Sequence, residues 1–471
     1  MNQLRYDITR YLCAAAEISP RFRTKVFKQI IDSSVRFVAP SYGVDVPLVA
    51  RHCLKGQIRD FIVEAALSVL LIWSLISSLN SFGVLFGIFQ FVLSLFTYPW
   101  LMAILLRWSN LYIGYQIVTK DLKKIQNSDS NKSLIELQYE KRINELEKLQ
   151  DGNVVYYSGY NPFVGSGIRV DGWSFVCSIE KKGEAQTQED IISLCDLYEY
   201  VDGNMKSLQI PKLTVKDMLY VKGSEVRGDI RFLPDVHLTP ISVVPDSLLN
   251  EYKEKQEENV RYFQTVQVVG WQGNVIFSSF FRVSKNDKHL FVEANYYALP
   301  PLKSEFYLID ELNSPIKLGS ILKMGFSSIL PAIVLLPLSP IRAYKSGMAF
   351  FAGVKDKKAL IKQVDENQKF DYGASESIRE MAASDRLQNF FQKSDLDMYR
   401  KQIERCFTDS VIDYLEEQGV DISEFVQRKE SIVNQGITIN GGEIHGDVVS
   451  VGSQTNKIIN QAKNVLQKSS I

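Results

Sequence analysis

The chain has 471 residues, enough for about two or three folded units besides any membrane part. Its 54 basic residues balance its 54 acidic residues, so overall charge does not favour binding to nucleic acid. The five cysteines are dispersed without a CxxC pair, which is typical of small buried side chains in a reducing compartment. The first residues lack a short apolar core followed by a cleavage site, so we expect no cleaved signal peptide.

The first 60 residues predict amphipathic helices, over residues 3–18 and 21–38. The polar face of the second helix is rich in Lys and Arg. A basic amphipathic helix can lie on an anionic membrane leaflet. It can equally be the solvated side of an ordinary helix pair, and the sequence leaves both interpretations open.

Residues 65–106 contain no Asp, Glu, Lys, Arg or His. One helix of this length would measure about 63 Å, roughly twice the hydrocarbon thickness of a bilayer. The segment therefore predicts a transmembrane hairpin within residues 61–107, with spans at about 61–80 and 82–106. The alternative is a buried core helix of a soluble protein, but such a helix is seldom apolar on all sides over this length.

The basic residues around this hairpin predict its orientation. Lys and Arg occur before and after it, and the turn between the spans has neither. Because cytoplasmic loops retain Lys and Arg, both ends of the hairpin should be cytoplasmic, in a multi-pass membrane protein. Small residues spaced four apart would let the two helices, or two copies of the chain, pack closely. These residues are Ser74, Ser78, Gly83 and Gly87.

After a helical linker at residues 120–150, the hydrophobic period changes to two at Asn153. Residues 153–312 predict a cytoplasmic α+β domain, because short strands joined by polar turns indicate an antiparallel meander. Asp171-Gly172 predicts a two-residue hairpin turn between strands 168–170 and 173–179. Later strands are expected at 262–269, 275–283, 290–299 and 306–309.

The apolar segment at residues 315–353 is ambiguous, because its core, residues 319–338, contains Lys323 and two prolines. A charge near the centre of a span costs about 2.5–3.5 kcal/mol on insertion scales. We favour a segment that lies on the membrane or re-enters it. A buried soluble segment and a third span are the alternatives, and a third span would place the rest of the chain outside the cell.

The last part of the chain predicts a helical region at residues 355–435 and a Gly-rich, strand-rich element at residues 436–456. So small an element has little core of its own, so we expect self-association through its edges. Deleting residues 436–471 should then lower the oligomeric mass in detergent. The tail at residues 457–471 has three lysines and no acidic residue.

The search for reactive groups finds no catalytic signature. The four histidines are far apart, and HExxH, GxSxG and GxxxxGK[ST] do not occur. We therefore predict no catalytic residue, metal ligand or cofactor. The best candidate for contact with a small ligand is the loop at residues 159–167, whose glycines would let backbone N–H groups approach an anion. A strand follows this loop, so a plain turn is the alternative. The candidate ligand residues are Asn161, Gly165, Ser166 and Gly167.

Five stretches of the sequence stand out: YLCAAA (11–16), YSGYNPFVGSG (157–167), LPPL (299–302), DYGASESIREMA (371–382) and VDISEFVQRKESIVNQGITINGG (420–442). They resemble those of a bacterial family of uncharacterised membrane proteins. The resemblance spans the whole chain and implies an inner-membrane setting. It brings no assigned activity and no known catalytic residues.

We expect a membrane-anchored protein whose α+β domain faces the cytoplasm and binds an unknown protein or small ligand. One alternative is an enzyme acting at the membrane surface, which two carboxylates or a His converging in one cleft of residues 153–312 would favour. The other is an oligomeric pore, for which Gln90, Ser94 and Thr97 would supply a sparse polar line.

Overall fold

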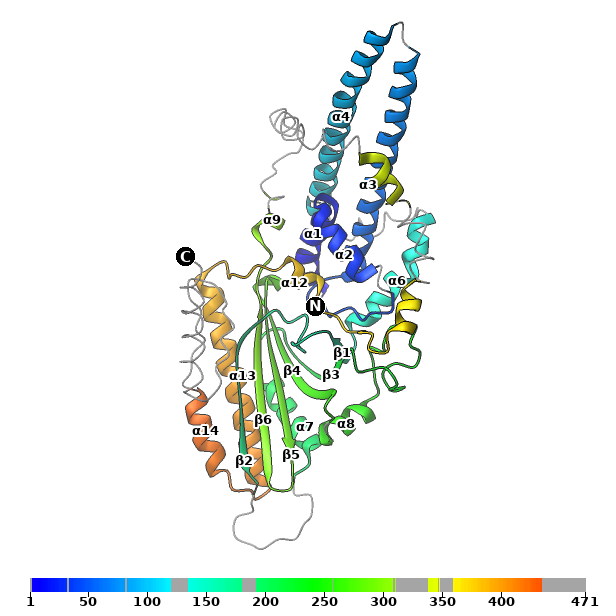
Figure 1. The fold of residues 1–471 in the computed structure, drawn as a ribbon. Coiled ribbons are helices and arrows are strands. Elements are labelled where there is room, and N and C mark those ends of the chain that lie inside the picture. The colour runs from blue at the N-terminus through cyan, green and yellow to red at the C-terminus, as the bar shows by residue number, and fades with distance from the viewer. Residues whose placement is uncertain are drawn as a thin grey trace, which may run out of the picture. The chain divides into compact units, whose positions relative to one another are not determined.

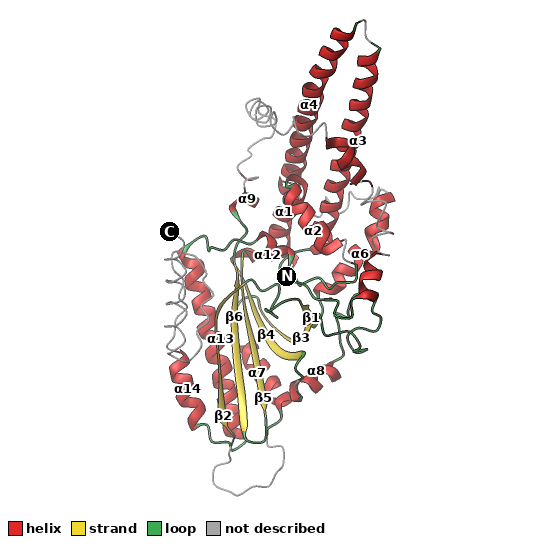
Figure 2. Cartoon of the chain, in the orientation of Figure 1, coloured by secondary structure: helices red, strands yellow, loops and turns green. Residues whose placement is uncertain are grey.

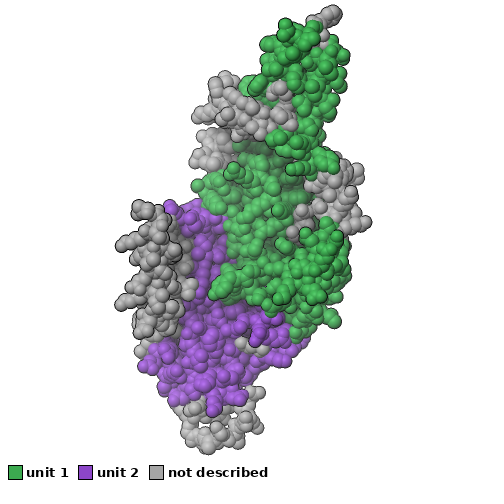
Figure 3. Space-filling model, viewed as in Figure 1, with its two compact units in different colours: residues 1–165, 222–242, 302–382 green, residues 166–221, 243–301, 383–471 purple. Residues whose placement is uncertain are grey.

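The computed structural model describes residues 2–31, 34–80, 83–119, 134–179, 192–255, 257–307, 310, 338–345, 347 and 359–433. The chain divides into two compact units, coloured separately in Figure 3. Unit 1 comprises residues 1–165, 222–242 and 302–382, and unit 2 comprises residues 166–221, 243–301 and 383–471. The predicted α+β class is confirmed by the helices and the mostly antiparallel sheet of Figure 2. The domain boundaries expected above stay predictions.

Unit 1 begins with α1 (Asn2–Ile18), α2 (Pro20–Val26) and the π-helix η1 (Phe27–Ile31). Ser19 caps α2, because its hydroxyl accepts a hydrogen bond from the Phe22 N–H at 3.4 Å. The helix predicted over residues 21–38 is shorter in the structure, because residues 34–38 are not helical. The reason is that the Phe37 N–H donates to the Tyr372 carbonyl at 2.8 Å, which commits this part of the backbone to a distant segment.

The apolar segment forms a hairpin of α3 (Val46–Leu79) and α4 (Val84–Thr119), which Figure 1 shows side by side. α3 begins earlier than the expected span. The Asp45 side chain accepts a hydrogen bond from the Leu48 N–H at 3.0 Å, and a proline occupies the first turn. Among the described residues, these two helices are long and apolar enough to cross a membrane.

Small and polar residues join the two helices of the hairpin. The Ser74 hydroxyl bonds to that of Ser94, and the Ser78 hydroxyl donates to the Gly87 carbonyl at 2.7 Å. The amide of Gln90 donates to a serine hydroxyl of α3 at 3.0 Å. Gly83 takes a φ of 118° where the turn enters α4. That this packing takes place within a membrane stays a prediction.

The rest of unit 1 includes one correction to the expected strands. Residues 306–309 were expected to form a strand, but residues 306 and 307 belong to the helix α9 (Ser304–Tyr307), and residues 308 and 309 lie outside the described residues. This helix follows a pair of prolines, and its buried Phe306 ring packs edge-on against Phe22 at 5.4 Å. Packing against α2 therefore decides the local conformation. The elements of this part are α6 (Leu134–Gln150), β1 (Val154–Tyr157), α9 (Ser304–Tyr307) and α12 (Ile378–Ala382).

Within the described part of unit 2, strands lie in the order β3-β4-β5-β6-β2, each antiparallel to its neighbour. The 3₁₀ turn η2 (Trp271–Gly273) joins β4 to β5. The meander of β4, β5 and β6 follows the expected pattern, whereas β3 was not predicted. The strands are β2 (Ile168–Ser178), β3 (Leu213–Lys222), β4 (Val260–Gly270), β5 (Val275–Lys285) and β6 (His289–Leu299).

The hairpin expected at Asp171-Gly172 is wrong, because β2 runs through these residues without turning back. It pairs with β6 along its length, and the register shifts between Arg169 and Asp171. An irregularity of this kind absorbs an extra residue without ending the ladder. The long row of backbone partners on β6 outweighs the local preference of Asp-Gly for a turn.

The helices of unit 2 are α7 (Leu194–Ser207), α8 (Asp246–Glu254), α13 (Phe390–Glu417) and α14 (Ser423–Val433). Asn389 caps α13, because its side chain accepts a hydrogen bond from the Gln392 N–H at 3.0 Å. α13 packs against β5, where the Phe407 ring stacks on Phe281 with centroids 4.0 Å apart. It ends at Glu417, and Gly419 just beyond it takes a φ of 76°, a conformation common after helix C-termini.

Some predictions fall outside the described residues. These include the Gly-rich element at 436–456, the tail at 457–471 and most of the segment at 315–353. Of that segment, residues 338–345 are helical, and the Arg342 guanidinium lies 3.6 Å from the carboxylate of Glu64 on α3.

Candidate functional site

Large apolar side chains are exposed along both helices of the hairpin. They extend from Ile62 to Leu79 on α3 and from Val84 to Leu105 on α4. We call this surface the apolar belt. These stretches correspond to about 27 and 33 Å of helix, close to the ~30 Å of a bilayer's hydrocarbon core. The belt therefore has the height and the chemistry of a surface that contacts lipid.

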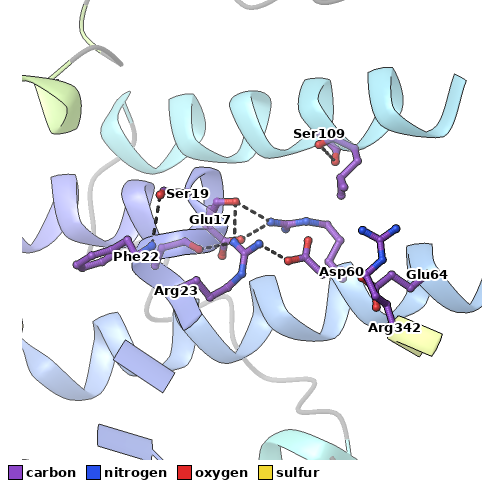
Figure 4. Close-up of polar contacts among 11 residues, drawn as sticks. Glu17, Ser19, Phe22, Arg23, Asp60, Glu64, Ser109 and Arg342 are labelled. Atoms are coloured by element: carbon purple, nitrogen blue, oxygen red, sulfur yellow. Dashed lines mark hydrogen bonds and ion pairs between the residues drawn. The ribbon is translucent and has the colours of Figure 1, made fainter. Parts of the chain in front are cut away.

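Charged residues of α3 nearer its N-terminus form a buried cluster with α1 and α2, shown in Figure 4. His52 Nδ1 lies 2.9 Å from one Glu17 carboxylate oxygen, and Arg59 donates to the other at 2.7 Å. Arg23 pairs with Asp60. Burial would raise the pKa of Glu17, but the hydrogen bond and charge of His52, with those of Arg59, lower it below its ordinary value.

This cluster joins α1 to α3. The Arg23 guanidinium donates to the Ala16 and Glu17 carbonyls at 2.6 and 3.1 Å, which satisfies acceptors at the C-terminal end of α1. Gly56 makes room for this side chain, because an added Cβ would lie 2.8 Å from Arg23 Cδ. The charges thus pair with one another, and the cluster is a structural support for the hairpin.

Unit 1 also contains a cavity of about 500 Å³, which we call the basic cavity. Three cationic side chains and one carboxylate line it, together with apolar and amide groups. The lining residues are Lys25, Lys28, Gln29, Ile30, Arg36, Phe37, Val38, Ala39, Ala359, Leu360, Gln363, Gly373, Ala374, Ser375 and Glu376.

One wall of the basic cavity is held by the strand β1. The Ala374 N–H donates to the Tyr156 carbonyl and the Ser158 N–H donates to the Ala374 carbonyl, each at 2.9 Å. Gly373 permits this approach, because an added Cβ would lie 2.3 Å from the Tyr157 carbonyl carbon. Two stretches noted in the sequence, residues 157–167 and 371–382, therefore meet beside the cavity.

Arg142 of α6 holds another part of the lining, the segment that carries Ile30 and Arg36. Its guanidinium donates to the carbonyls of Ile30 and Arg36 at 3.3 and 3.0 Å, and to the Thr239 hydroxyl at 3.2 Å. Burial lowers the pKa of Arg142 below its ordinary value. One buried cation thereby fixes both ends of the segment that carries Arg36.

The four residues proposed from the sequence as ligand contacts are involved in the local folding of their loop. Gly165 has a φ of 97°, and an added Cβ would lie 2.3 Å from the Pro40 carbonyl oxygen. Gly167 meets a backbone carbonyl of β6 in the same way, and Ser166 is buried. Asn161 accepts a hydrogen bond at 3.1 Å from the backbone N–H two residues later. None of these four residues lines the basic cavity, and ligand contact by this loop stays a prediction.

Unit 2 has a buried polar network centred on Glu404. Trp173 and Tyr296 donate to one carboxylate oxygen at 2.6 and 3.0 Å, and Arg400 lies 3.2 Å from the other. Arg400 also pairs with Asp171 at 3.0 Å. Burial raises the pKa of Glu404 above its ordinary value, and the Arg400 charge opposes this. The network ties α13 to the sheet.

Neither the cavity nor this network was predicted from the sequence. The one usable signal was the basic face of residues 21–38, which contains Lys25 and Lys28. Within the described ranges, no group of three His, Cys, Asp or Glu residues is placed to hold a metal ion.

Comparison with known proteins yields one match. A family model described as "AbeC-like domain" matches residues 172–448, from β2 through α14 and beyond. No curated protein and no solved structure matches the chain. The expected membership of a family of uncharacterised proteins is thereby supported, while the membrane setting and the motif at 157–167 stay predictions. Because the match covers more than half of the sequence, the chain belongs to the AbeC-like domain family.

Proposed function

We propose that this protein is a membrane-anchored binding protein, held in the bilayer by the α3–α4 hairpin. The observation that carries the proposal is the exposure of the apolar belt. In the most apolar 18-residue windows of the two helices, only 11% and 18% of the residues are buried. A core helix of a soluble protein would be largely covered by protein.

Two further features agree with this proposal. The rings of Trp108 and Tyr112 stack on α4 with centroids 5.5 Å apart, just beyond the belt. Aromatic rings of this kind favour the headgroup level of a membrane. The basic residues flanking the hairpin favour an orientation with both of its ends in the cytoplasm. The binding part of the proposal is supported by the basic cavity of unit 1.

Membrane fractionation tests the anchoring. We expect the wild-type chain in the membrane pellet after a sodium carbonate wash. The double variant Phe89→Lys/Leu93→Lys should shift to the supernatant or be degraded, because each charge near the centre of a span costs about 2.5–3.5 kcal/mol. Both replaced side chains are exposed, so internal packing is spared. Val243→Lys, at an exposed apolar residue of unit 2, is the control.

A wild-type chain that stays in the aqueous fraction without detergent would contradict the proposal. So would a double variant that is retained in the pellet as fully as the Val243→Lys control.

A further inference from the structure

We infer that the basic cavity binds a ligand made of a phosphate ester attached to an apolar or aromatic group. This inference rests on the binding role proposed above and is independent of the anchoring role. It follows from the charges, the size and the mixed lining of the cavity.

The three cationic residues of the cavity, Lys25, Lys28 and Arg36, are exposed to solvent. Lys25 pairs with Glu376 at 2.6 Å, but their side chains are 51% and 33% exposed. An exposed pair of this kind contributes little free energy, so a doubly charged phosphate can compete for the lysine. Lys28 is an exposed residue of the same wall.

Arg36 adds a guanidinium, the group best suited to phosphate. Its described contact is with the Phe370 ring, 5.3 Å from the guanidinium carbon. A cation–π contact positions a cation without neutralising its charge. Arginine presents planar N–H donors that match phosphate oxygens in pairs. Because Arg142 binds the Arg36 carbonyl, the backbone that carries this side chain is already fixed.

The remaining lining indicates that the ligand is more than inorganic phosphate. The apolar residues Ile30, Phe37, Val38 and Leu360 line the cavity together with the cationic residues. Its volume of about 500 Å³ falls in the range of small-molecule sites, which are mostly apolar with a few placed polar groups. The walls are also linked to each other, because the Gln29 amide donates to the Ser375 hydroxyl at 3.2 Å.

Two sources supply this chemistry, a soluble nucleotide-like ester and the headgroup of an anionic phospholipid. The full chain in phosphatidylcholine nanodiscs is titrated with the fluorescent nucleotide trinitrophenyl-ATP, with inorganic phosphate as competitor. In the second arm, the melting temperature of unit 1 is compared between phosphatidylcholine nanodiscs and nanodiscs that also contain phosphatidylglycerol.

Two variants and one control variant are measured in both parts of this experiment. Lys28→Gln/Arg36→Gln removes two exposed charges from the lining, and Ala359→Trp fills the cavity without changing charge. Lys303→Gln, at an exposed residue of unit 1 outside the lining, is the matched control. The charge variant should weaken binding about tenfold or more, as expected for lost charge-assisted hydrogen bonds.

Nucleotide binding that both variants weaken and the control preserves supports a soluble phosphate ester. A phosphatidylglycerol-dependent rise in melting temperature that both variants abolish supports a lipid headgroup. The inference is overturned if neither probe acts, or if the variants respond as the control does. Such a failure leaves the anchoring intact, because fractionation tests that separately.

Discussion

At the scale of single residues, the structure shows how charged side chains are stabilised in the interior of this chain. Glu17 is 2% exposed and Arg23 is fully buried, which alone would cost several kcal/mol of desolvation for each ion. Each of them instead meets an opposite charge or a helix carbonyl. Removing one member of such a pair leaves the other charge buried without compensation.

The first prediction concerns Glu17 and pH. Its pKa in the folded protein is lowered, so its carboxylate stabilises the fold above the unfolded pKa of about 4.3, and this stabilisation is lost as pH falls through the folded pKa. Glu17→Gln should therefore be less stable than wild type at neutral pH, and the difference should shrink in acid. Melting temperatures between about pH 7 and pH 3 measure this.

Glu305→Gln is the control for this experiment, because Glu305 is exposed in the same unit. A difference between wild type and Glu17→Gln that does not change with pH would contradict the assignment.

The second prediction concerns the close approach at Gly373. Gly373→Ala should destabilise unit 1 by about 1–3 kcal/mol, because its Cβ would overlap the Tyr157 backbone. Gly203→Ala is the matched control: Gly203 lies inside α7 with open space around it, so alanine should stabilise by about 0.5–1 kcal/mol. Denaturant unfolding distinguishes the two, and equal effects of both changes would contradict the close approach.

At the scale of elements, packing decides where helices and strands begin and end. α3 starts at Val46 because Asp45 caps it, although the apolar segment starts much later. β2 continues through Asp171-Gly172 because β6 supplies its hydrogen-bond partners. α13 is held to the sheet by stacked rings and by the Glu404 network.

The third prediction concerns this helix. Phe407→Ala should cost about 3–5 kcal/mol, because it removes a fully buried ring that stacks on Phe281. Phe390→Ala, on the same helix but 75% exposed, should change stability by less than about 0.5 kcal/mol. Trp173 lies 6.4 Å from the Phe407 ring, so its fluorescence reports the unfolding of this unit in denaturant. Similar losses in both variants would contradict the packing described.

At the scale of the whole molecule, the proposed anchoring function depends on whether the apolar belt lies in a membrane. The height of the belt, close to that of a bilayer's hydrocarbon core, supports the proposal that this hairpin lies in lipid. In that case the basic residues on both sides of the hairpin predict that its two ends lie on the same, cytoplasmic side of the membrane.

The fourth prediction tests this orientation. A single cysteine at exposed Phe390, in a chain whose five native cysteines are replaced by serine, should react with a membrane-impermeant maleimide in inside-out vesicles. It should be protected in right-side-out vesicles. The reverse pattern would place unit 2 outside the cell and would contradict the orientation predicted from the basic flanks.

The sequence by itself determined the features that depend on the local pattern of apolar, polar and charged side chains. An uncharged stretch of 42 residues predicts the hairpin, and alternation with short polar turns predicts the meander of β4, β5 and β6. These features depend on residues within one or two elements, where the side-chain period reports the environment directly.

Only the tertiary structure decided the rest. β2 is one continuous strand because it pairs with β6 along its length. The β6 residues with which it pairs lie more than 100 positions away in the sequence. The basic cavity has walls from residues 25–39 and 359–376, and its cations are spaced in the sequence like those of any solvated helix face. When a distant segment supplies a hydrogen-bond partner or a cavity wall, the contact produces no periodic pattern of side chains in the local sequence. Such a contact therefore cannot be predicted from the sequence pattern.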